Sequence, residues 1–179
     1  MHMRGTLPGI LVVLILVMNA GCERSGNEPG PSMQWLQQDL VEGNARPRLQ
    51  HGMLDSGFYQ PLLGPDWAPY PLAEQQATLI SQNRFIYLMA MTYEVTGDMT
   101  YREAVQRAAD YLLAYFADPD RPGYWVREVR PDGTASNRRF HAYGHTQVIF
   151  ALAHAFQVSG DTRYRDAATQ TWLALNVPK

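Results

Sequence analysis

Several common sequence features are missing from this chain of 179 residues, and each absence excludes a class of protein or site. Cys22 is the only cysteine, so an internal disulfide cannot form. No lysine- or arginine-rich run stands out, because the arginines of residues 120–139 are diluted by acidic residues, and this argues against nucleic acid as a partner. The chain also has no nucleophile elbow, phosphate loop, dinucleotide fingerprint or zinc-ligand spacing.

The composition is that of a globular protein. The chain is 46% hydrophobic and 18% charged, with a net charge of −2, which excludes a disordered chain. Its length fits one ordinary domain.

The N-terminus is predicted to be a targeting segment. Leu7–Met18 is apolar apart from Pro8 and Gly9, and an apolar core of roughly ten residues is too short to span a bilayer but long enough for a signal peptide. Small residues then precede Cys22, as in a bacterial lipoprotein signal, where the cysteine becomes the acylated first residue. Asn19 departs from that pattern, because such signals usually carry an aliphatic residue there.

We therefore expect a lipoprotein-like signal over residues 1–22, with Cys22 as the lipidation site, and a polar tether over 23–32. Ordinary secretion and an uncleaved anchor remain alternatives. In each case the protein is exported to the cell envelope, lipid-anchored or periplasmic. Contact with the membrane is expected through the lipid anchor alone, and residues 33–179 form the domain.

A repeat dominates the rest of the chain. Val95–Ala104 (VTGDMTYREA) is similar to Val158–Ala167 (VSGDTRYRDA), and 63 residues separate Asp98 from Asp161. Each unit contains an apolar helix, a Gly-Asp turn and a second helix. Such hairpins cannot bury their apolar faces alone and need neighbours.

The pattern predicts five helices and one short hairpin. Proline at five positions of 45–71 makes that segment irregular, and Gly123–Arg130 has strand character before the turn Pro131-Asp132-Gly133. The helices are expected over Met33–Glu42 (ended by Gly43), Leu72–Val95, Asp98–Phe116, Phe140–Val158 and Asp161–Leu175.

The second and fourth helices are apolar on most sides, whereas the third and fifth are amphipathic. A helix that is apolar all round is buried all round. This alternation predicts an all-α fold in which an inner ring of helices is wrapped by an outer ring. It is the layout of an α/α toroid, here incomplete, with one short β-hairpin.

Polar residues at matching repeat positions are the candidate site residues. The repeat aligns Gln82 with His145, near the mouth of the expected toroid. Arg84 directly precedes a long apolar run and needs a partner, because an unpaired buried charge is costly. In a functional interpretation, the partner is a set of sugar oxygens or a developing oxyanion. In a structural interpretation, it is a nearby acid such as Glu74.

His145 has three open interpretations. It lies four residues after His141, so the two share a helix face and could bind a metal. It could also be a general acid/base, since histidine titrates near neutrality, or a structural histidine. Gly144 inside a helix indicates close approach by a ligand or a neighbouring backbone.

Four segments together resemble the N-acylglucosamine 2-epimerase family, which includes cellobiose 2-epimerases and aldose–ketose isomerases. The order and spacing of these segments carry the resemblance, over residues 33–175. They are Gly57-Phe58-Tyr59, Gln82-Asn83-Arg84, Gly123–Gly133 and Tyr143-Gly144-His145 with the helix that follows.

The resemblance implies an (α/α)6 barrel that binds a mono- or disaccharide centrally. It implies proton transfer next to the sugar carbonyl by histidines, without a metal or other cofactor. Arg84, Gln82 and Tyr143 would then bind the substrate, and His145 would be a catalytic or supporting group. The family's principal histidines are expected beyond residue 179, so the chain is expected to be an N-terminal portion, or to complete its ring by self-association.

Two other classes stay open. An α/α-toroid glycoside hydrolase or lyase needs paired carboxylic acids, but Glu103, Asp110 and Asp166 fall on the outer helices. A non-catalytic envelope lipoprotein that binds a sugar is the second alternative.

Overall fold

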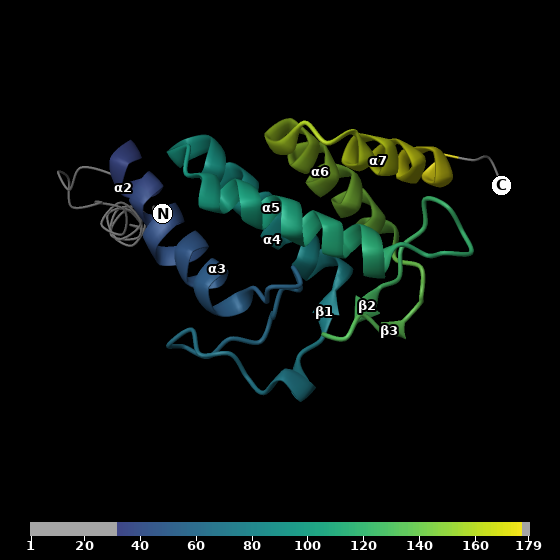
Figure 1. Cartoon of the computed structure of the whole chain (residues 1–179), viewed down its shortest axis with the longest axis horizontal. Helices are drawn as coiled ribbons and strands as arrows, with labels where there is room; N and C mark the ends of the chain where they lie inside the picture. Colours follow the sequence, from purple (N-terminus) through teal and green to yellow (C-terminus); the bar gives the residue numbers. More distant parts are fainter. Residues whose placement is uncertain (1–31, 177–179) are drawn as a thin grey trace, which may run out of the picture. The chain divides into compact units, whose positions relative to one another are not determined.

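The structure is a computed structural model that describes residues 32–176 (Figure 1). Cys22, the predicted signal segment and the predicted tether up to residue 31 lie outside the described residues. Residues from Leu36 onward form one compact unit. Just before it, the Ser32 hydroxyl accepts a hydrogen bond from the Trp35 backbone N–H (3.1 Å) at the start of helix α2 (Met33–Gln38).

The first helical stretch is longer than the sequence predicts. Helix α2 continues through the π-helical segment η1 (Asp39–Ala45) into α3 (Arg46–Gly52). The predicted end at Gly43 is therefore wrong, and so is the irregular assignment of residues 46–52. Gly43 costs only about 1 kcal/mol inside a helix, and Pro47 lies in the first turn of α3, where its missing N–H is not needed.

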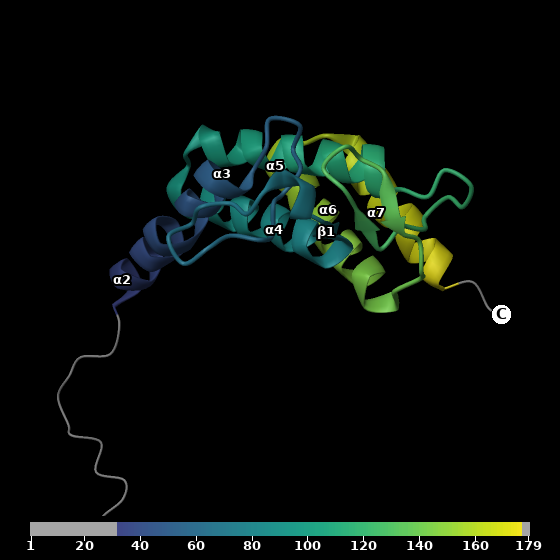
Figure 2. The ribbon, with the colours of Figure 1, turned by 90° about the horizontal axis from the view of Figure 1, so that it is seen from below.

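Two helical hairpins form the main body, as predicted. The first joins α4 (Leu79–Thr96) to α5 (Met99–Tyr111), which continues as the π-helical segment η3 (Leu112–Phe116). The second joins α6 (Ala142–Ser159) to α7 (Thr162–Leu175). Helices α4 and α6 pack side by side, α5 packs on both of them, and α7 packs on α6 (Figure 2).

The repeat is visible in the connections of the two hairpins. The first helix of each ends on a glycine in the left-handed conformation, Gly97 (φ 68°) and Gly160 (φ 76°). The next residue in each caps the second helix: Asp98 accepts from the Thr100 N–H, and Asp161 from the Arg163 N–H (both 2.9 Å). The two connections therefore share a left-handed glycine and an aspartate cap, 63 residues apart in the sequence.

Helix α4 begins later than predicted because the chain before it forms other structure. Leu72–Glu74 is a 3-10 turn (η2), and Ala77–Thr78 is strand β1. Strand β1 pairs antiparallel with β2 (Glu128–Val129), which pairs with β3 (Ala135–Asn137). The predicted hairpin is thus confirmed, with its turn closed by the Gly133 N–H on the Arg130 carbonyl (2.9 Å), and β1 adds a third strand to it.

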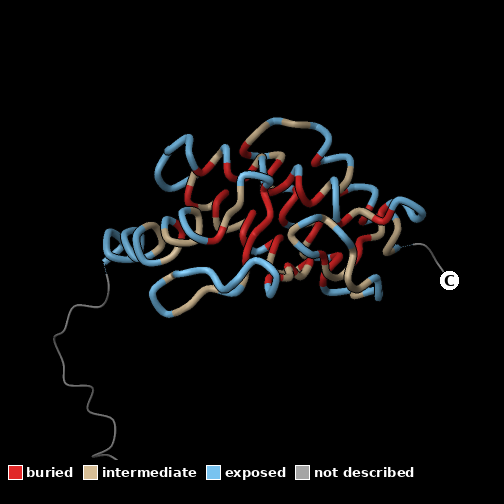
Figure 3. Tube along the Cα trace, turned by 60° about the horizontal axis from the view of Figure 1, so that its bottom comes forward, coloured by how far each residue is buried: buried red, intermediate tan, exposed pale blue. Residues whose placement is uncertain are grey.

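The buried residues gather in the middle of the helical hairpins, where the red segments of Figure 3 are concentrated. One part of the expected burial is wrong: α6 is not covered on every side. Tyr143 and Phe150 are 48% and 44% exposed, because among residues 32–176 the helices that pack closely on α6 are α4, α5 and α7.

Candidate active site

A pocket of about 440 Å³ opens at the N-terminal half of α4, within the range of small-molecule sites. The wall formed by α4 carries Ser81, Arg84, Phe85 and Leu88. These residues are spaced three and four apart, so they share one helix face. Ile80, in the first turn of α4, also lines the pocket. The rest of the wall comes from α3, the loop after it and the residue that precedes α4. Those residues are Arg48, Tyr59, Pro61 and Thr78.

The start of α4 is fixed by a reciprocal cap. The Thr78 hydroxyl accepts from the Ser81 backbone N–H (3.0 Å), and the Ser81 hydroxyl accepts from the Thr78 N–H (2.9 Å). Such a capping box satisfies two backbone donors that a helix start leaves open. It also fixes the turn that places Arg84 on the pocket wall.

Arg84 is exposed at this wall rather than buried in the apolar run. Within residues 32–176 no carboxylate lies within ion-pair distance of its guanidinium, so the alternative of an ion pair with Glu74 is not observed. A guanidinium has five N–H donors in a rigid fork. Arg84 can therefore present this fork to the oxygens of a ligand.

Arg48 also lines this pocket, beside Tyr59 of the Gly57-Phe58-Tyr59 segment, and no sequence pattern singled it out. Nη1 of Arg48 donates to the Tyr59 hydroxyl (2.8 Å), and the Tyr59 ring stacks on Phe85 (centroids 4.6 Å apart, planes at 14°). Arg48 was missed because its segment was expected to be irregular. The signal that was available is Pro47, since proline is favoured in the first turn of a helix.

Gln82 does not face the pocket, because its side chain is fully buried. Its Oε1 accepts from the Tyr59 backbone N–H (3.0 Å), and its Nε2 donates to the carbonyls of Gly57 (2.9 Å) and Ala108 (3.0 Å). The amide thus joins the loop before α4 to α5. Its observed contacts are with the backbone, whereas the sequence analysis expected it to contact a sugar.

His145 is also fully buried, and both of its ring nitrogens are engaged. Nε2 accepts from the Trp125 N–H (3.1 Å), so Nδ1 carries the proton and donates to the His141 carbonyl (3.0 Å). Burial lowers the pKa of His145 below its ordinary value of 6.5. Of the three interpretations that the sequence left open, these contacts favour the structural one, because neither ring nitrogen is free for acid/base chemistry in this arrangement.

The start of α6 brings His141 and Tyr143 to the surface. His141 caps the helix, and its Nδ1 accepts from the Gly144 N–H (3.2 Å). A Cβ on Gly144 would lie 2.9 Å from a methyl group of Leu79, so the close approach indicated by this glycine is to a neighbouring side chain. Tyr143 is half exposed and does not line the pocket at α4.

His141 lines a small adjoining pocket of about 70 Å³ with Arg127 and Leu79. Thr78 and Ile80 belong to both pockets. The structure therefore places His141 near the pocket at α4. It does not bring Arg84, Gln82, Tyr143 and His145 together around one cavity.

The described part of the chain holds neither a cluster of metal ligands nor a membrane-spanning helix. No three histidine, cysteine, aspartate or glutamate side chains gather there closely enough to hold a metal ion. In residues 32–176, no helix has the length and apolar character needed to cross a bilayer.

The stacked hairpins define the class of this protein as an α/α toroid built from helical hairpins, and known structures agree. A solved D-mannose isomerase superposes with a TM-score of 0.73, at 23% identity, over 83% of this chain and 37% of that one. A glycoside hydrolase family 76 mannosidase from Bacteroides thetaiotaomicron superposes with a TM-score of 0.59, at 16% identity, over 80% of this chain and 38% of that one. At these identities the likeness shows the fold.

The family is shown by sequence. Residues 57–177 match the family model for N-acylglucosamine 2-epimerase (GlcNAc 2-epimerase), and the chain belongs to this family. A cellobiose 2-epimerase of Bacteroides fragilis is 26% identical over 132 residues, which are 72% of this chain and 32% of that protein. The chain thus spans about a third of the length of the relatives it matches.

Proposed function

We propose that this chain is part of a sugar 2-epimerase or aldose–ketose isomerase and that it supplies the arginine that binds the substrate, Arg84. The observation that carries the proposal is Arg84, an exposed guanidinium without an acidic partner among the described residues, on the wall of a pocket in a member of this family. In such a reaction the proton on the carbon next to the sugar carbonyl is removed, and negative charge develops on the carbonyl oxygen. A fixed guanidinium stabilises that charge.

The proton-transferring groups are proposed to be histidines. His145 is not a candidate for that role, because both of its nitrogens are bound within the fold. His141 lies at the adjoining small pocket, and the principal histidines are expected beyond residue 179. Arg84 therefore binds and polarises the sugar, and other groups move the proton.

Exchange of the C2 proton tests this proposal. The protein, expressed from the complete reading frame that contains these residues, is incubated with mannose, glucose or cellobiose in D2O, and loss of the C2 proton signal is followed by NMR. We expect exchange in the unaltered protein and a large loss in Arg84→Gln. Arg139→Gln is the matched control, since Arg139 is exposed and lies outside the pocket.

Either of two results contradicts the proposal. Exchange that is unchanged in Arg84→Gln removes the role of Arg84. Sugar binding without any exchange favours the non-catalytic sugar-binding alternative. Hydrolysis of a polysaccharide is not favoured, because none of the nine residues that line the pocket is acidic, whereas glycoside hydrolysis usually needs two carboxyl groups.

The proposal also places the protein at the cell envelope, anchored through acylated Cys22. Mass spectrometry of the mature N-terminus tests this point. A lipid on Cys22, and release of Cys22→Ser into the soluble fraction, are the expected results. A mature chain that begins elsewhere contradicts the anchor.

A further inference from the structure

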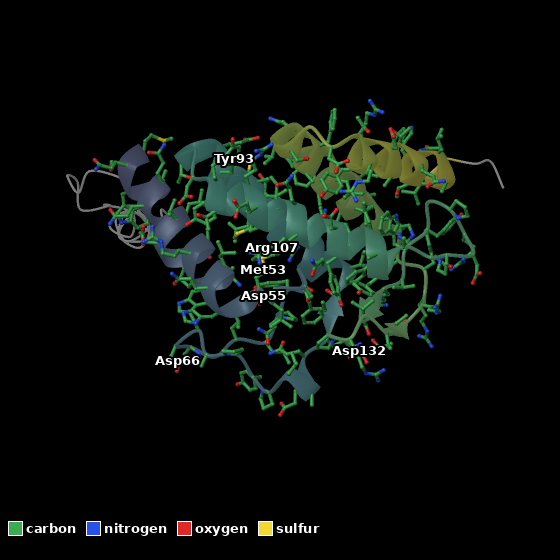
Figure 4. All side chains as sticks on the ribbon, viewed as in Figure 1. Met53, Asp55, Asp66, Tyr93, Arg107 and Asp132 are labelled. Carbon is green, nitrogen blue, oxygen red and sulfur yellow. The ribbon has the colours of Figure 1, made fainter. Side chains whose placement is uncertain are left out.

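The pocket at α4 is cationic and contains no compensating acid. Two of its nine lining residues are arginines, Arg48 and Arg84, and none is aspartate or glutamate. Many other arginines of residues 32–176 pair with carboxylates. These are Arg46, Arg107, Arg121, Arg127, Arg138, Arg163 and Arg165. The pairing on the surface is illustrated by Arg107 and Asp55 (3.8 Å), both labelled in Figure 4.

Arg48 is held in place by two aromatic side chains. It donates to the Tyr59 hydroxyl (2.8 Å), and its guanidinium carbon lies 5.1 Å from the centre of the Trp67 ring. Among residues 32–176 the Tyr59 hydroxyl is the only hydrogen-bond acceptor of this guanidinium. The remaining N–H donors are thus available to a ligand, on a group whose orientation is already set.

The loop that carries Trp67 has an unfavourable backbone conformation at the residue that makes this contact. Trp67 has φ of 66°, the only positive φ of a non-glycine residue within the described residues. The loop is closed by the Gly64 N–H on the Ala68 carbonyl (2.8 Å), and the Asp66 carboxylate accepts from the Ala68 N–H (3.2 Å); Figure 4 labels Asp66. A bulky residue in this region is strained, and such strain persists only where the surroundings enforce it.

We infer that this pocket takes a sugar that carries an anionic group, a carboxylate or a phosphate ester, and that Arg48 binds that group. The sugar part rests on the proposed function, in which Arg84 is already assigned to the carbonyl end. Arg48 is the second cation of the same pocket, and a guanidinium pairs with planar carboxylates and with phosphates through two parallel hydrogen bonds. Arg48 is thus a specificity-determining residue, and Tyr59 and Trp67 are positioning residues that act through it.

Titration calorimetry with four probes tests the inference on the protein from the complete reading frame. The probes are glucose, glucuronate, glucose 6-phosphate and inorganic phosphate. At least one of the two acidic sugars is expected to bind about tenfold or more tightly than glucose, since a hydrogen bond to a charged group is worth about twice a neutral one. This preference should weaken as salt is added.

Substitutions assign the effect to Arg48. Arg48→Gln should remove the preference, so that the affinity for the acidic sugar falls to within about threefold of that for glucose, because the charge that pairs with the anionic group is gone. Tyr59→Phe keeps the ring that stacks on Phe85 but removes the acceptor for Arg48, so it should reduce the preference in part. Arg139→Gln removes the same charge from the surface outside the pocket and should change nothing.

The outcomes separate this inference from the proposed function. If the C2 proton of glucose exchanges, but glucose, glucuronate and glucose 6-phosphate bind equally well, the inference of an anionic ligand is overturned. The proposed enzyme function then remains intact. Binding of an acidic sugar that depends on Arg48, without any exchange, supports the anion site and contradicts the enzyme assignment. Inorganic phosphate that binds as tightly as glucose 6-phosphate overturns the acidic sugar as the ligand. So does a preference that survives in both Arg48→Gln and Tyr59→Phe.

Discussion

The backbone N–H of Trp125 donates a hydrogen bond to Nε2 of His145 across 3.1 Å. The same relationship occurs in the first repeat, where the Tyr59 N–H donates to Oε1 of Gln82 across 3.0 Å. His145 and Gln82 are equivalent positions of the two inner helices. Each of these two side chains therefore connects an inner helix to a segment outside the helical hairpins, at Tyr59 in the first repeat and at Trp125 in the second.

The first prediction concerns His145 and stability. His145→Ala should lower the free energy of unfolding by about 2–4 kcal/mol, because it leaves a cavity and removes the acceptor of the Trp125 N–H. His145→Gln keeps an acceptor, as Gln82 does in the other repeat, and should cost less. Urea unfolding measures both variants. A His145→Ala variant within about 0.5 kcal/mol of the unaltered protein would contradict the structural role.

The second prediction concerns the pH dependence that His145 causes. Burial lowers its pKa in the folded state below 6.5, so the unfolded chain binds the proton more tightly. The contribution of His145 to stability is therefore complete above about pH 6.5, and it is lost as the pH falls from there through the folded-state pKa. Unfolding free energies measured between pH 5 and 8 should decline toward acid less steeply in His145→Gln. Equal slopes in the two proteins would show that His145 does not titrate differently on unfolding.

The third prediction concerns Gln82. Gln82→Leu should destabilise the protein by about 3 kcal/mol, because it leaves the Tyr59 N–H and the carbonyl groups of Gly57 and Ala108 without this buried partner. Gln157→Leu is the matched control, since the Gln157 amide is exposed and donates to Glu94 at the surface (2.9 Å). The control should stay within about 0.5 kcal/mol. Equal losses in the two variants would contradict the core role of Gln82.

The fourth prediction concerns two glycines that approach equivalent carbonyl groups of the two repeats. A Cβ on Gly57 would lie 2.1 Å from the Arg107 carbonyl oxygen, and one on Gly123 would lie 2.6 Å from the Gln170 carbonyl oxygen. Arg107 and Gln170 are 63 positions apart, as the repeat requires.

Alanine at Gly57 or Gly123 should therefore cost more than the strain of a positive φ alone, because backbone must also move. Gly97→Ala separates the two effects, since Gly97 has a positive φ of 68° but nothing within 4 Å of its Cβ position. We expect about 1 kcal/mol at Gly97 and clearly more at the other two glycines. Thermal melts of the three variants give the order directly.

The helical hairpins could be predicted because their signals are local. The Gly-Asp pairs at 97–98 and 160–161 end one helix and cap the next, and this chemistry depends on neighbours in sequence. The helical stretch from Gly43 to Gly52 was missed because Gly43 and Pro47 are read as helix breakers. At Gly43, tertiary packing offsets the helix penalty of glycine. Pro47 lies in the first turn of α3, where the N–H that proline lacks is not needed.

The candidate site was predictable in part, and the failures have one physical cause. The repeat correctly placed Gln82 and His145 at equal heights, but it does not say whether a polar side chain meets a ligand or the backbone. The partners that bury them, in Gly57-Phe58-Tyr59 and Gly123-Tyr124-Trp125, lie outside the 63-residue register, since 66 positions separate Gly57 from Gly123. Such long-range contacts are absent from any local pattern.

The last prediction separates function from stability at Arg84. Its exposed side chain forms no ion pair within residues 32–176, so Arg84→Gln should leave the free energy of unfolding within about 0.5 kcal/mol. Loss of a group that stabilises a developing oxyanion typically lowers kcat by about 10²–10³-fold, and this loss is expected here for proton exchange at C2. Arg84→Lys keeps the charge but not the two-pronged hydrogen bonding, so it should recover a fraction of the rate. Unchanged kcat in a folded Arg84→Gln protein would place the chemistry elsewhere, whereas unfolding of that variant would mean that this guanidinium serves the fold.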